Sequence, residues 1–526
     1  MKLSACVIVK NEEKNLPQWL AYANAAADEK IVVDTGSTDR TVELARAAGA
    51  QVYSFPWQEN FAAAKNFAIE QATGDWIAFL DADEYFLPED CLAVRALLAK
   101  ADAAVDAFQF RRVDIDIDRN DAYIGASIQW RIFRRRTGLR YEGAVHEELQ
   151  DAAGRRLRAD FVPGLTIYHT GYSASVARQK AERNLAILLA ERRRRGPQTC
   201  DAFYLADCYY GLGDYEAAAR FAREAADSPL QAQGMNNRPY AVLIQSLINL
   251  DAPAEEIQEA CRKAERRYPD LPEFPLMWGG YLFQNKDYRE AETNLRRGLE
   301  LYEAESNGSA PDISAGEQAR SFLPAALWQL GKLAAWRGDK GAALEYWTRG
   351  LRLAPYEKVL LRTAATLLKG LPGADVISFF NTIYDKRADA VYLAQTLAQT
   401  GLSDAALYYD RQAGASALSD AERFRLAGRV PAFTAAAMPA GNMGGGASGD
   451  PRGAGRVRHA GADGVSSGGV RRGGNGAGKS GGGSAGAGRT GALSGRKIHC
   501  GAGRTPAPDN KGKNTDENIG LCDRQK

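Results

Sequence analysis

An apolar run that ends abruptly in carboxylates constrains the first part of this sequence most strongly. Residues 76–86 read WIAFLDADEYF, so a strand-like stretch is followed at once by Asp81, Asp83 and Glu84. In a parallel α/β sheet, ligands bind outside the carboxyl ends of the strands. Because Asp81 and Asp83 are two residues apart, extended backbone directs both the same way, as a site for one hard cation requires. A surface acidic turn is the alternative interpretation.

Strands and helices alternate in the residues around this stretch. Residues 3–9 (LSACVIV), 30–33 and 51–55 have the composition of short strands, and residues 41–48 and 60–72 have the spacing of helices. Short connections between alternating strands and helices are typical of βαβ units around a parallel sheet. The sequence therefore predicts an α/β domain with a mostly parallel, Rossmann-like sheet.

Four motifs carry a resemblance to a known family. They are CVIVKNEE (6–13), IVVDTGSTDRT (31–41), AAAKNFAIEQATGDW (62–76) and AFLDADE (78–84). Their order and approximate spacing resemble those of family 2 glycosyltransferases, and four ordered motifs are far more specific than one acidic pair. The resemblance implies a GT-A glycosyltransferase domain, a nucleotide-sugar-binding fold, over residues 1–172.

The resemblance implies roles for individual residues of the donor site. Asp34 would accept a hydrogen bond from the nucleotide base, and Lys65 would lie near the nucleotide or its phosphates. Asp81 would face the ribose and the metal, and Asp83 would ligate Mn²⁺ or Mg²⁺. His169 would complete the metal shell or contact the diphosphate; a hydrogen-bonded structural histidine is the alternative.

The resemblance also places the catalytic base within residues 141–149 (YEGAVHEEL). An inverting transfer needs a carboxylate or imidazole within hydrogen-bond reach of the attacking atom. We expect Glu147 to be this base, with His146 and Glu148 as competitors. The histidine-glutamate version departs from the family's more common Glu-Asp pair, and it resembles the branch that carries C-terminal helical repeats.

Two residues depart from the family's usual pattern, and one further strand has two possible interpretations. Thr35 and Lys65 stand where many members have aspartate and arginine, and a lysine acts as a point charge rather than a bidentate fork. Residues 129–136 (QWRIFRRR) predict another strand. Its arginines would contact phosphates or an anionic acceptor, but we favour a solvated basic edge strand, since edge strands commonly carry charge.

The second half of the chain is predicted to be helical. Residues 173–196 form a linking helix that Gly196 and Pro197 end, and a repeat follows when the chain is aligned on three aspartates. Large residues precede these aspartates at a fixed distance, and small residues follow at two further positions, which resembles the tetratricopeptide repeat. The aligned residues are Asp214, Asp287 and Asp339; Leu205, Trp278 and Leu330; Ala218, Ala291 and Ala343; Ala225, Gly298 and Gly350.

Residues 197–428 would therefore form an all-α tetratricopeptide-like solenoid. Its concave surface would hold a peptide acceptor or support a homodimer; a helical wrap that only stabilises the enzyme is the alternative. Residues 429–526 are dominated by Gly, Ala, Arg and Ser, cannot bury a core, and are predicted to be disordered. The composition changes so abruptly that a reading-frame artefact is an equally weighted explanation.

Composition limits the partners and the cellular location that we expect for this protein. A net charge of +2 argues against a nucleic-acid partner, and the seven scattered cysteines indicate a reducing compartment. We expect no signal peptide and no integral membrane segment, and hence a cytoplasmic protein that can also associate peripherally with the inner membrane face.

These observations predict an inverting, metal-dependent glycosyltransferase of the hexosyltransferase class. It would transfer a sugar from a nucleotide diphosphate sugar, with a UDP-sugar favoured, to a peptide or cell-surface glycan acceptor. The alternative from another class is a tetratricopeptide interaction scaffold whose glycosyltransferase domain is inactive.

Overall fold

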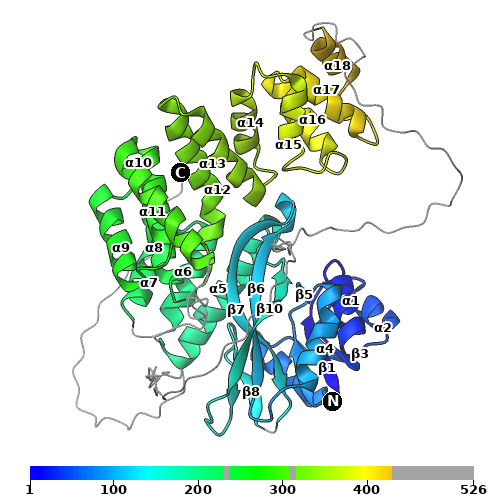
Figure 1. Cartoon of the computed structure of the whole chain (residues 1–526). Helices are drawn as coiled ribbons and strands as arrows, with labels where there is room; N and C mark the ends of the chain where they lie inside the picture. The colour runs from blue at the N-terminus through cyan, green and yellow to red at the C-terminus, as the bar shows by residue number, and fades with distance from the viewer. Residues whose placement is uncertain (137, 199, 229–235, 307–315, 429–526) are drawn as a thin grey trace, which may run out of the picture. The chain divides into compact units, whose positions relative to one another are not determined.

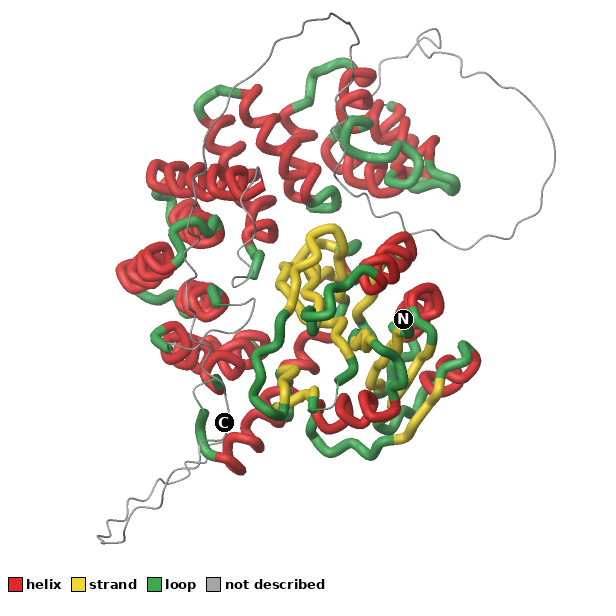
Figure 2. The backbone as a smooth tube through the Cα atoms, turned by 60° about the horizontal axis from the view of Figure 1, so that its bottom comes forward, coloured by secondary structure: helices red, strands yellow, loops and turns green. Residues whose placement is uncertain are grey.

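The computed structural model describes residues 1–428 except 137, 199, 229–235 and 307–315. Within these residues, the named strands lie between residues 3 and 169, and every named element after them is a helix. Figure 2 shows the strands in yellow and the helices in red. The predicted fold class, an α/β domain followed by an all-α region, is confirmed for this part of the chain. The predicted disordered tail, and with it the reading-frame question, lies outside the described residues.

One mixed sheet dominates the N-terminal domain, with strand order β3-β2-β1-β4-β7-β6-β10-β5. Strands β3, β2, β1 and β4 pair in parallel, so their carboxyl ends lie along the same edge; β7 is antiparallel to both β4 and β6. A separate hairpin joins β8 to β9. The strands are β1 (Leu3–Val9), β2 (Glu29–Asp34), β3 (Gln51–Ser54), β4 (Trp76–Phe79), β5 (Glu84–Phe86), β6 (Ala107–Asp116), β7 (Ala122–Arg134), β8 (Leu139–Glu142), β9 (Glu148–Asp151) and β10 (Ala159–His169).

Alternation along the strands builds a separate apolar core on each face of the sheet. In β1, Leu3, Ala5 and Val7 pack with the helices α1 (Leu16–Ala26) and α4 (Cys91–Ala99). The intervening Cys6 packs on the other face, where it joins the α3 helix (Phe61–Gln71) and the β8 strand. Successive side chains of a strand point to opposite faces, so a sheet buried on both sides needs apolar residues at consecutive positions, as LSACVIV supplies.

Strand β7 corrects one prediction. The QWRIFRRR segment was expected to be a solvated edge strand, but β7 lies inside the sheet, between β4 and β6. Arg131 consequently has a buried side chain that points toward the carboxylates of Asp81, which follows β4, and of Glu84 on β5, rather than toward solvent. The charge of the segment suggested an edge; the partners that neutralise Arg131 are far away in the sequence and could not be seen there.

Register places three polar residues side by side near the end of the sheet. His169 of β10 lies opposite Glu84 of the antiparallel β5 strand and opposite Asp114 of the parallel β6 strand. The three residues are far apart in sequence, and the pairing of β5, β10 and β6 brings them together.

Helices run in succession through the second half of the chain, as Figure 1 shows from green to yellow. The aligned aspartates Asp214 and Asp339 are N-caps whose side chains accept backbone N–H hydrogen bonds, and Asp287 accepts one in the same way. These helices are α5 (Ala174–Arg195), α6 (Asp201–Leu212), α7 (Tyr215–Ala226), α8 (Arg238–Asn249), α9 (Ala254–Arg267), α10 (Glu273–Gln284), α11 (Tyr288–Ser306), α12 (Ala319–Trp336), α13 (Lys340–Leu353), α14 (Lys358–Leu367), α15 (Gly373–Phe380), α16 (Ala390–Thr400), α17 (Ser403–Gln412) and α18 (Asp420–Ala427); α2 (Thr41–Ala47) belongs to the sheet domain. No described helix is both long and apolar enough to cross a bilayer.

A short segment before α12 joins the helical region to the sheet. Glu317 forms an antiparallel bridge with Ala126 of β7, and its carboxylate pairs with Arg111 of β6 at 2.5 Å. The hydroxyl of Tyr123 donates to the backbone oxygen of Glu317 at 2.9 Å. Asn237, which is fully buried, holds the adjacent Gly316 through a donated and an accepted hydrogen bond.

Small residues let the helices of the repeats approach closely. The alanines Ala218, Ala291 and Ala343, predicted to lie at such crossings, are fully buried. At Gly331 of α12, an added Cβ would collide with the indole of Trp347, whose Nε1–H donates to the backbone oxygen of Trp328. The crossing of α12 and α13 therefore requires glycine at this position.

We expect Gly331→Ala to destabilise the protein by about 1–3 kcal/mol, because an overpacked core must shift its neighbours. Gly341→Ala is the matched control: this glycine is also helical, but an added Cβ would make only an ordinary 3.6 Å contact. Removing a helical glycine there should stabilise the protein by up to about 1 kcal/mol. Thermal unfolding followed by circular dichroism measures both, and equal melting temperatures for the two variants would contradict the packing described.

Candidate functional site

A buried lysine lies between two carboxylates beyond the carboxyl end of β4. The Nζ atom of Lys65, on α3, is 2.8 Å from Oδ1 of Asp81 and 2.7 Å from Oε1 of Glu147. Its side chain is only 3% exposed. Burial lowers the pKa of Lys65, but the charges of Asp81 and Glu147 outweigh it and hold this pKa above its usual range. Lys65 is therefore a fixed positive charge that joins the two predicted sides of the site.

Asp81 is held by two cations. Its Oδ1 atom faces Lys65, and Oδ2 is 3.2 Å from a terminal nitrogen of Arg131. Burial raises the pKa of Asp81, but Lys65 and Arg131 outweigh it and hold the pKa well below its usual range. Asp81 is consequently ionised across the physiological range of pH, and both of its oxygens are engaged.

Glu84 supports Arg131 from within the protein. The fully buried carboxylate of Glu84 accepts hydrogen bonds from the Nε and a terminal nitrogen of Arg131 at 2.5 and 2.6 Å. It also accepts a bond from the backbone N–H of Asp81 at 3.2 Å. Such a two-point pair fixes the guanidinium plane and thus its approach to Asp81. The sequence alone does not mark Arg131 as a member of this cluster, because its acidic partners Asp81 and Glu84 are 50 and 47 residues away from it along the chain.

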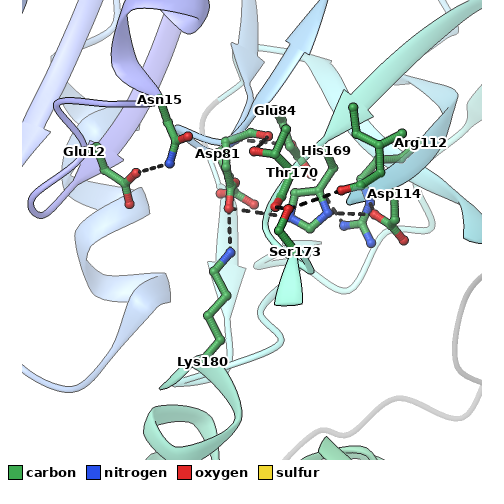
Figure 3. A network of polar contacts seen from close by, with 12 residues as sticks. Glu12, Asn15, Asp81, Glu84, Arg112, Asp114, His169, Thr170, Ser173 and Lys180 are labelled. Atoms are coloured by element: carbon green, nitrogen blue, oxygen red, sulfur yellow. Dashed lines mark hydrogen bonds and ion pairs between the residues drawn. The ribbon is translucent and has the colours of Figure 1, made fainter. Parts of the chain in front are cut away.

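A second cluster contains Asp83, His169 and Asp114. Nδ1 of His169 is 2.6 Å from Oδ1 of Asp114, and Nε2 is 3.5 Å from Oδ2 of Asp83. Lys180, on α5, places its Nζ 2.5 Å from the same Asp83 oxygen. Figure 3 shows the His169 ring beside Asp114 and the Lys180 side chain rising from α5 toward the carboxylates.

The charges of this second cluster reinforce one another. Burial raises the pKa of Asp83, but His169 and Lys180 outweigh it and hold the pKa well below its usual range. Burial also raises the pKa of Asp114, which Arg112 and His169 lower overall. For His169, burial lowers the pKa, while the charge of Asp83 and the hydrogen bond with Asp114 raise it. Asp83 and Asp114 are therefore ionised, and they lie on opposite sides of the imidazole.

The second cluster fits a divalent cation better than the first. Asp83 and His169 direct a carboxylate oxygen and an imidazole nitrogen to one place, and Gly171 leaves that place open: an added Cβ would overlap both of these atoms and the Lys180 ammonium. Asp114 contacts the other ring nitrogen, which is how the outer shell of metal sites orients a histidine ligand. Among the described residues, however, no three His, Cys, Asp or Glu side chains converge as a metal site.

The predicted metal trio is thus not brought together as one set. Asp83 and His169 converge, whereas Asp81 faces Lys65 and Arg131. Two protein ligands leave most of the coordination shell of Mg²⁺ or Mn²⁺ to water and to phosphate oxygens, which is the usual arrangement when these ions accompany a nucleotide.

Asp34 is the last residue of β2, directly before the turn that leads to α2. Its Oδ1 accepts a hydrogen bond from the backbone N–H of Ser37 at 3.0 Å. The neighbouring loop after β1 interlocks with this turn, because Asn11 accepts from the backbone N–H of Thr38 at 2.7 Å and its own N–H donates to Ser37 Oγ at 2.9 Å. The two loops at the parallel edge therefore hold Asp34 in a defined position.

The three competing bases have different surroundings. Glu147 is 13% exposed and faces Lys65, whereas Glu148 is exposed at the start of β9. His146 has a left-handed backbone (φ 55°), and its ring stacks on Tyr204 of α6 with the centroids 3.9 Å apart. Burial lowers the pKa of His146, and its Nε2 is enclosed without a hydrogen-bond partner. A residue of the helical region thus packs against the predicted base segment.

Residues 4–161 match the family described as glycosyl transferase family 2. They form a glycosyl transferase family 2 domain. The resemblance predicted from the four motifs is confirmed by this match, and the motifs supply Lys65, Asp81 and Asp83 to the two clusters.

Two relatives of this chain are described as a TPR repeat-containing protein and as a glycosyltransferase. The chain is 34% identical over 238 residues to a TPR repeat-containing protein of Synechococcus elongatus, covering 42% of this chain and 56% of that protein. It is 29% identical over 192 residues to the SPbeta prophage-derived glycosyltransferase SunS of Bacillus subtilis, covering 36% and 44%. The chain thus spans about half the length of the curated relatives it matches.

Among solved structures, the chain resembles S. aureus TarS (residues 1–349). The identity is 16%, and the match covers 51% of this chain and 91% of that one. The TM-score is 0.27, which is too low to add to the fold assignment.

We expect Glu84→Gln to destabilise the protein by about 3–5 kcal/mol, because it removes the two-point anionic partner of the buried Arg131 and leaves only the single contact with Asp81. Glu142→Gln is the matched control, since Glu142 pairs with Arg140 on the surface, where the two side chains are 39% and 55% exposed. Its loss should cost no more than about 1 kcal/mol. Denaturant unfolding of the two variants compares them; similar midpoints would show that Glu84 does not support the site as described.

Proposed function

We propose that this chain is an inverting, metal-dependent glycosyltransferase of the hexosyltransferase class. The observation that carries the proposal is the pair of adjoining charge clusters, Lys65–Asp81–Glu147 and Asp83–His169–Asp114, within and next to a glycosyl transferase family 2 domain. In this proposal the site binds a nucleotide diphosphate sugar at the carboxyl edge of the sheet, which is where open α/β sheets bind their ligands. We favour a UDP-sugar as donor.

The metal ligands in this proposal are Asp83 and His169, with Asp114 as the residue that orients His169. A bound Mn²⁺ or Mg²⁺ would neutralise negative charge that develops on the departing diphosphate. Asp81 would contact the donor ribose and lie beside the metal. Its ion pairs with Lys65 and Arg131 engage both carboxylate oxygens, so Asp83 is the better placed of the two aspartates for metal ligation.

Donor and acceptor sides of the proposed site meet at Lys65. On the donor side, Asp34 would bind the base and Lys65 would lie near the phosphates. On the acceptor side, Glu147 would remove the proton from the attacking group, and it already faces the Lys65 ammonium at 2.7 Å. His146, which is enclosed against Tyr204, would position this segment rather than act as the base.

The other parts of the chain have supporting roles in the proposal. Residues 1–172 would be the transferase domain, residues 173–196 its linking helix, and residues 197–428 the tetratricopeptide-like region. That region would hold a peptide or cell-surface glycan acceptor or support a homodimer. The protein would act in the cytoplasm, with peripheral association at the inner membrane face.

Two substitutions test the assignment. Asp83→Asn should abolish Mn²⁺-dependent binding of UDP, because a neutral amide replaces the carboxylate ligand. Glu147→Gln should retain Mn²⁺-dependent binding but slow sugar transfer by about 10²–10⁴-fold, as loss of a general base does. Calorimetry with UDP and GDP measures binding, and release of nucleotide from UDP- and GDP-sugars measures turnover.

Glu142→Gln, an exposed change on the β8 strand, serves as the control and should leave both quantities unchanged. If the wild type with Mn²⁺ neither binds nor turns over any UDP- or GDP-sugar, and Asp83→Asn behaves identically, the proposed function is wrong. The chain would then fit the alternative of an interaction scaffold with an inactive domain.

A further inference from the structure

Helix α5 contributes two cations to the site although it lies outside the matched family region, which ends at residue 161. Lys180 and Arg183 are three residues apart, so they share one face of this helix. The Nζ of Lys180 contacts Asp83 at 2.5 Å. Burial lowers the pKa of Arg183, and the charges of Asp83, Glu12, Asp81 and Glu147 raise it, which indicates that these carboxylates lie near its guanidinium.

The ammonium of Lys180 contacts the Asp83 carboxylate oxygen that a metal ion bound by Asp83 and His169 would also contact. This oxygen is Oδ2, the atom that lies 3.5 Å from His169 Nε2. A divalent cation bound by Asp83 and His169 would meet this ammonium at close range, and two like charges in a partly buried site repel strongly. A diphosphate resolves the conflict, since it brings enough negative charge and enough oxygens for both cations.

The side chain of Arg183 is held in place by contacts with uncharged groups. Its guanidinium lies over the ring of Phe61, 5.0 Å from the centroid, and donates to Oδ1 of Asn184. No ion pair among the described residues includes Arg183. Burial lowers the pKa of Arg183, which the surrounding carboxylates only partly offset. A guanidinium held in this way suits a phosphate, whose geometry matches its planar fork.

We propose that Lys180 and Arg183 bind the diphosphate of the nucleotide donor, with Lys180 exchanging Asp83 for a phosphate oxygen when metal and donor enter together. This inference rests on the proposed function and assigns part of its donor site to the first helix after the transferase domain. It makes binding of metal and nucleotide mutually dependent: the ammonium opposes the metal when the metal is alone and assists it when the diphosphate is present.

Titration of the full-length protein with Mn²⁺ alone, with UDP plus Mn²⁺ and with uridine tests this exchange. Lys180→Met should bind Mn²⁺ alone about tenfold more tightly than the wild type, because the competing ammonium is gone. The same variant should bind UDP with Mn²⁺ about tenfold more weakly. Arg183→Ala should show mainly this second effect, since Lys180 but not Arg183 forms an ion pair with Asp83. Uridine, which has no phosphate, should bind all proteins equally.

Two further variants serve as controls. Arg178→Ala removes a cation from another face of α5, where Arg178 is 69% exposed and pairs with Glu182, and should change none of these affinities. Lys180→Arg keeps the positive charge, so this variant, unlike Lys180→Met, should bind UDP with Mn²⁺ about as tightly as the wild type. Circular dichroism confirms that each variant is folded; Lys180 is 30% exposed, which suits substitution.

The outcomes separate this inference from the function on which it rests. If the wild type binds UDP or GDP with Mn²⁺ but Lys180→Met and Arg183→Ala bind it equally well, the inference is overturned and the proposed function stands. If Lys180→Met weakens binding of Mn²⁺ alone as well, Lys180 only supports Asp83, and the inference is again overturned. Failure of the wild type to bind either nucleotide overturns both.

Discussion

The ammonium of Lys65 is the interaction on which the arrangement of the site depends. A lysine that is almost wholly buried must have its charge balanced, and here Asp81 and Glu147 balance it from two different parts of the chain. Asp81 follows a central strand of the sheet, and Glu147 precedes a strand of the small β8–β9 hairpin. One charge therefore fixes the hairpin against the carboxyl edge of the sheet and sets the distance between the predicted donor and acceptor sides.

The surrounding pairs form layers behind this ammonium. Glu84 holds Arg131, which turns toward Asp81; Asp114 holds His169, which turns toward Asp83. In each case a buried carboxylate orients a second group that contacts one of the two aspartates. Such supported side chains keep their geometry without substrate, as electrostatic catalysis requires.

Much of this architecture could be predicted from the sequence. The alternation of strands and helices, the acidic end of the fourth strand and the repeat aligned on Asp214, Asp287 and Asp339 are local or periodic features, and the structure has the corresponding elements. The pairs that organise the site are different in kind. Lys180 and Asp83 are 97 residues apart, and Arg131 and Glu84 are 47 apart. Only strand order and helix docking bring such residues together, and composition alone suggested a solvated edge for Arg131.

The contacts of Glu317 limit how the helical region can vary in length. Its bridge to Ala126, its ion pair with Arg111 and the hold of Asn237 on Gly316 tie a point just before α12 to the sheet. Helices α6 to α11 thus span a closed loop with both ends attached. A repeat inserted into or deleted from that loop would displace Glu317 from its strand. Repeats added after α14 would disturb neither Glu317 nor the exposed ion pair between Arg119 of the sheet domain and Glu357. Additional repeats are therefore accommodated more easily towards the C-terminal end of the helical region than between α6 and α11.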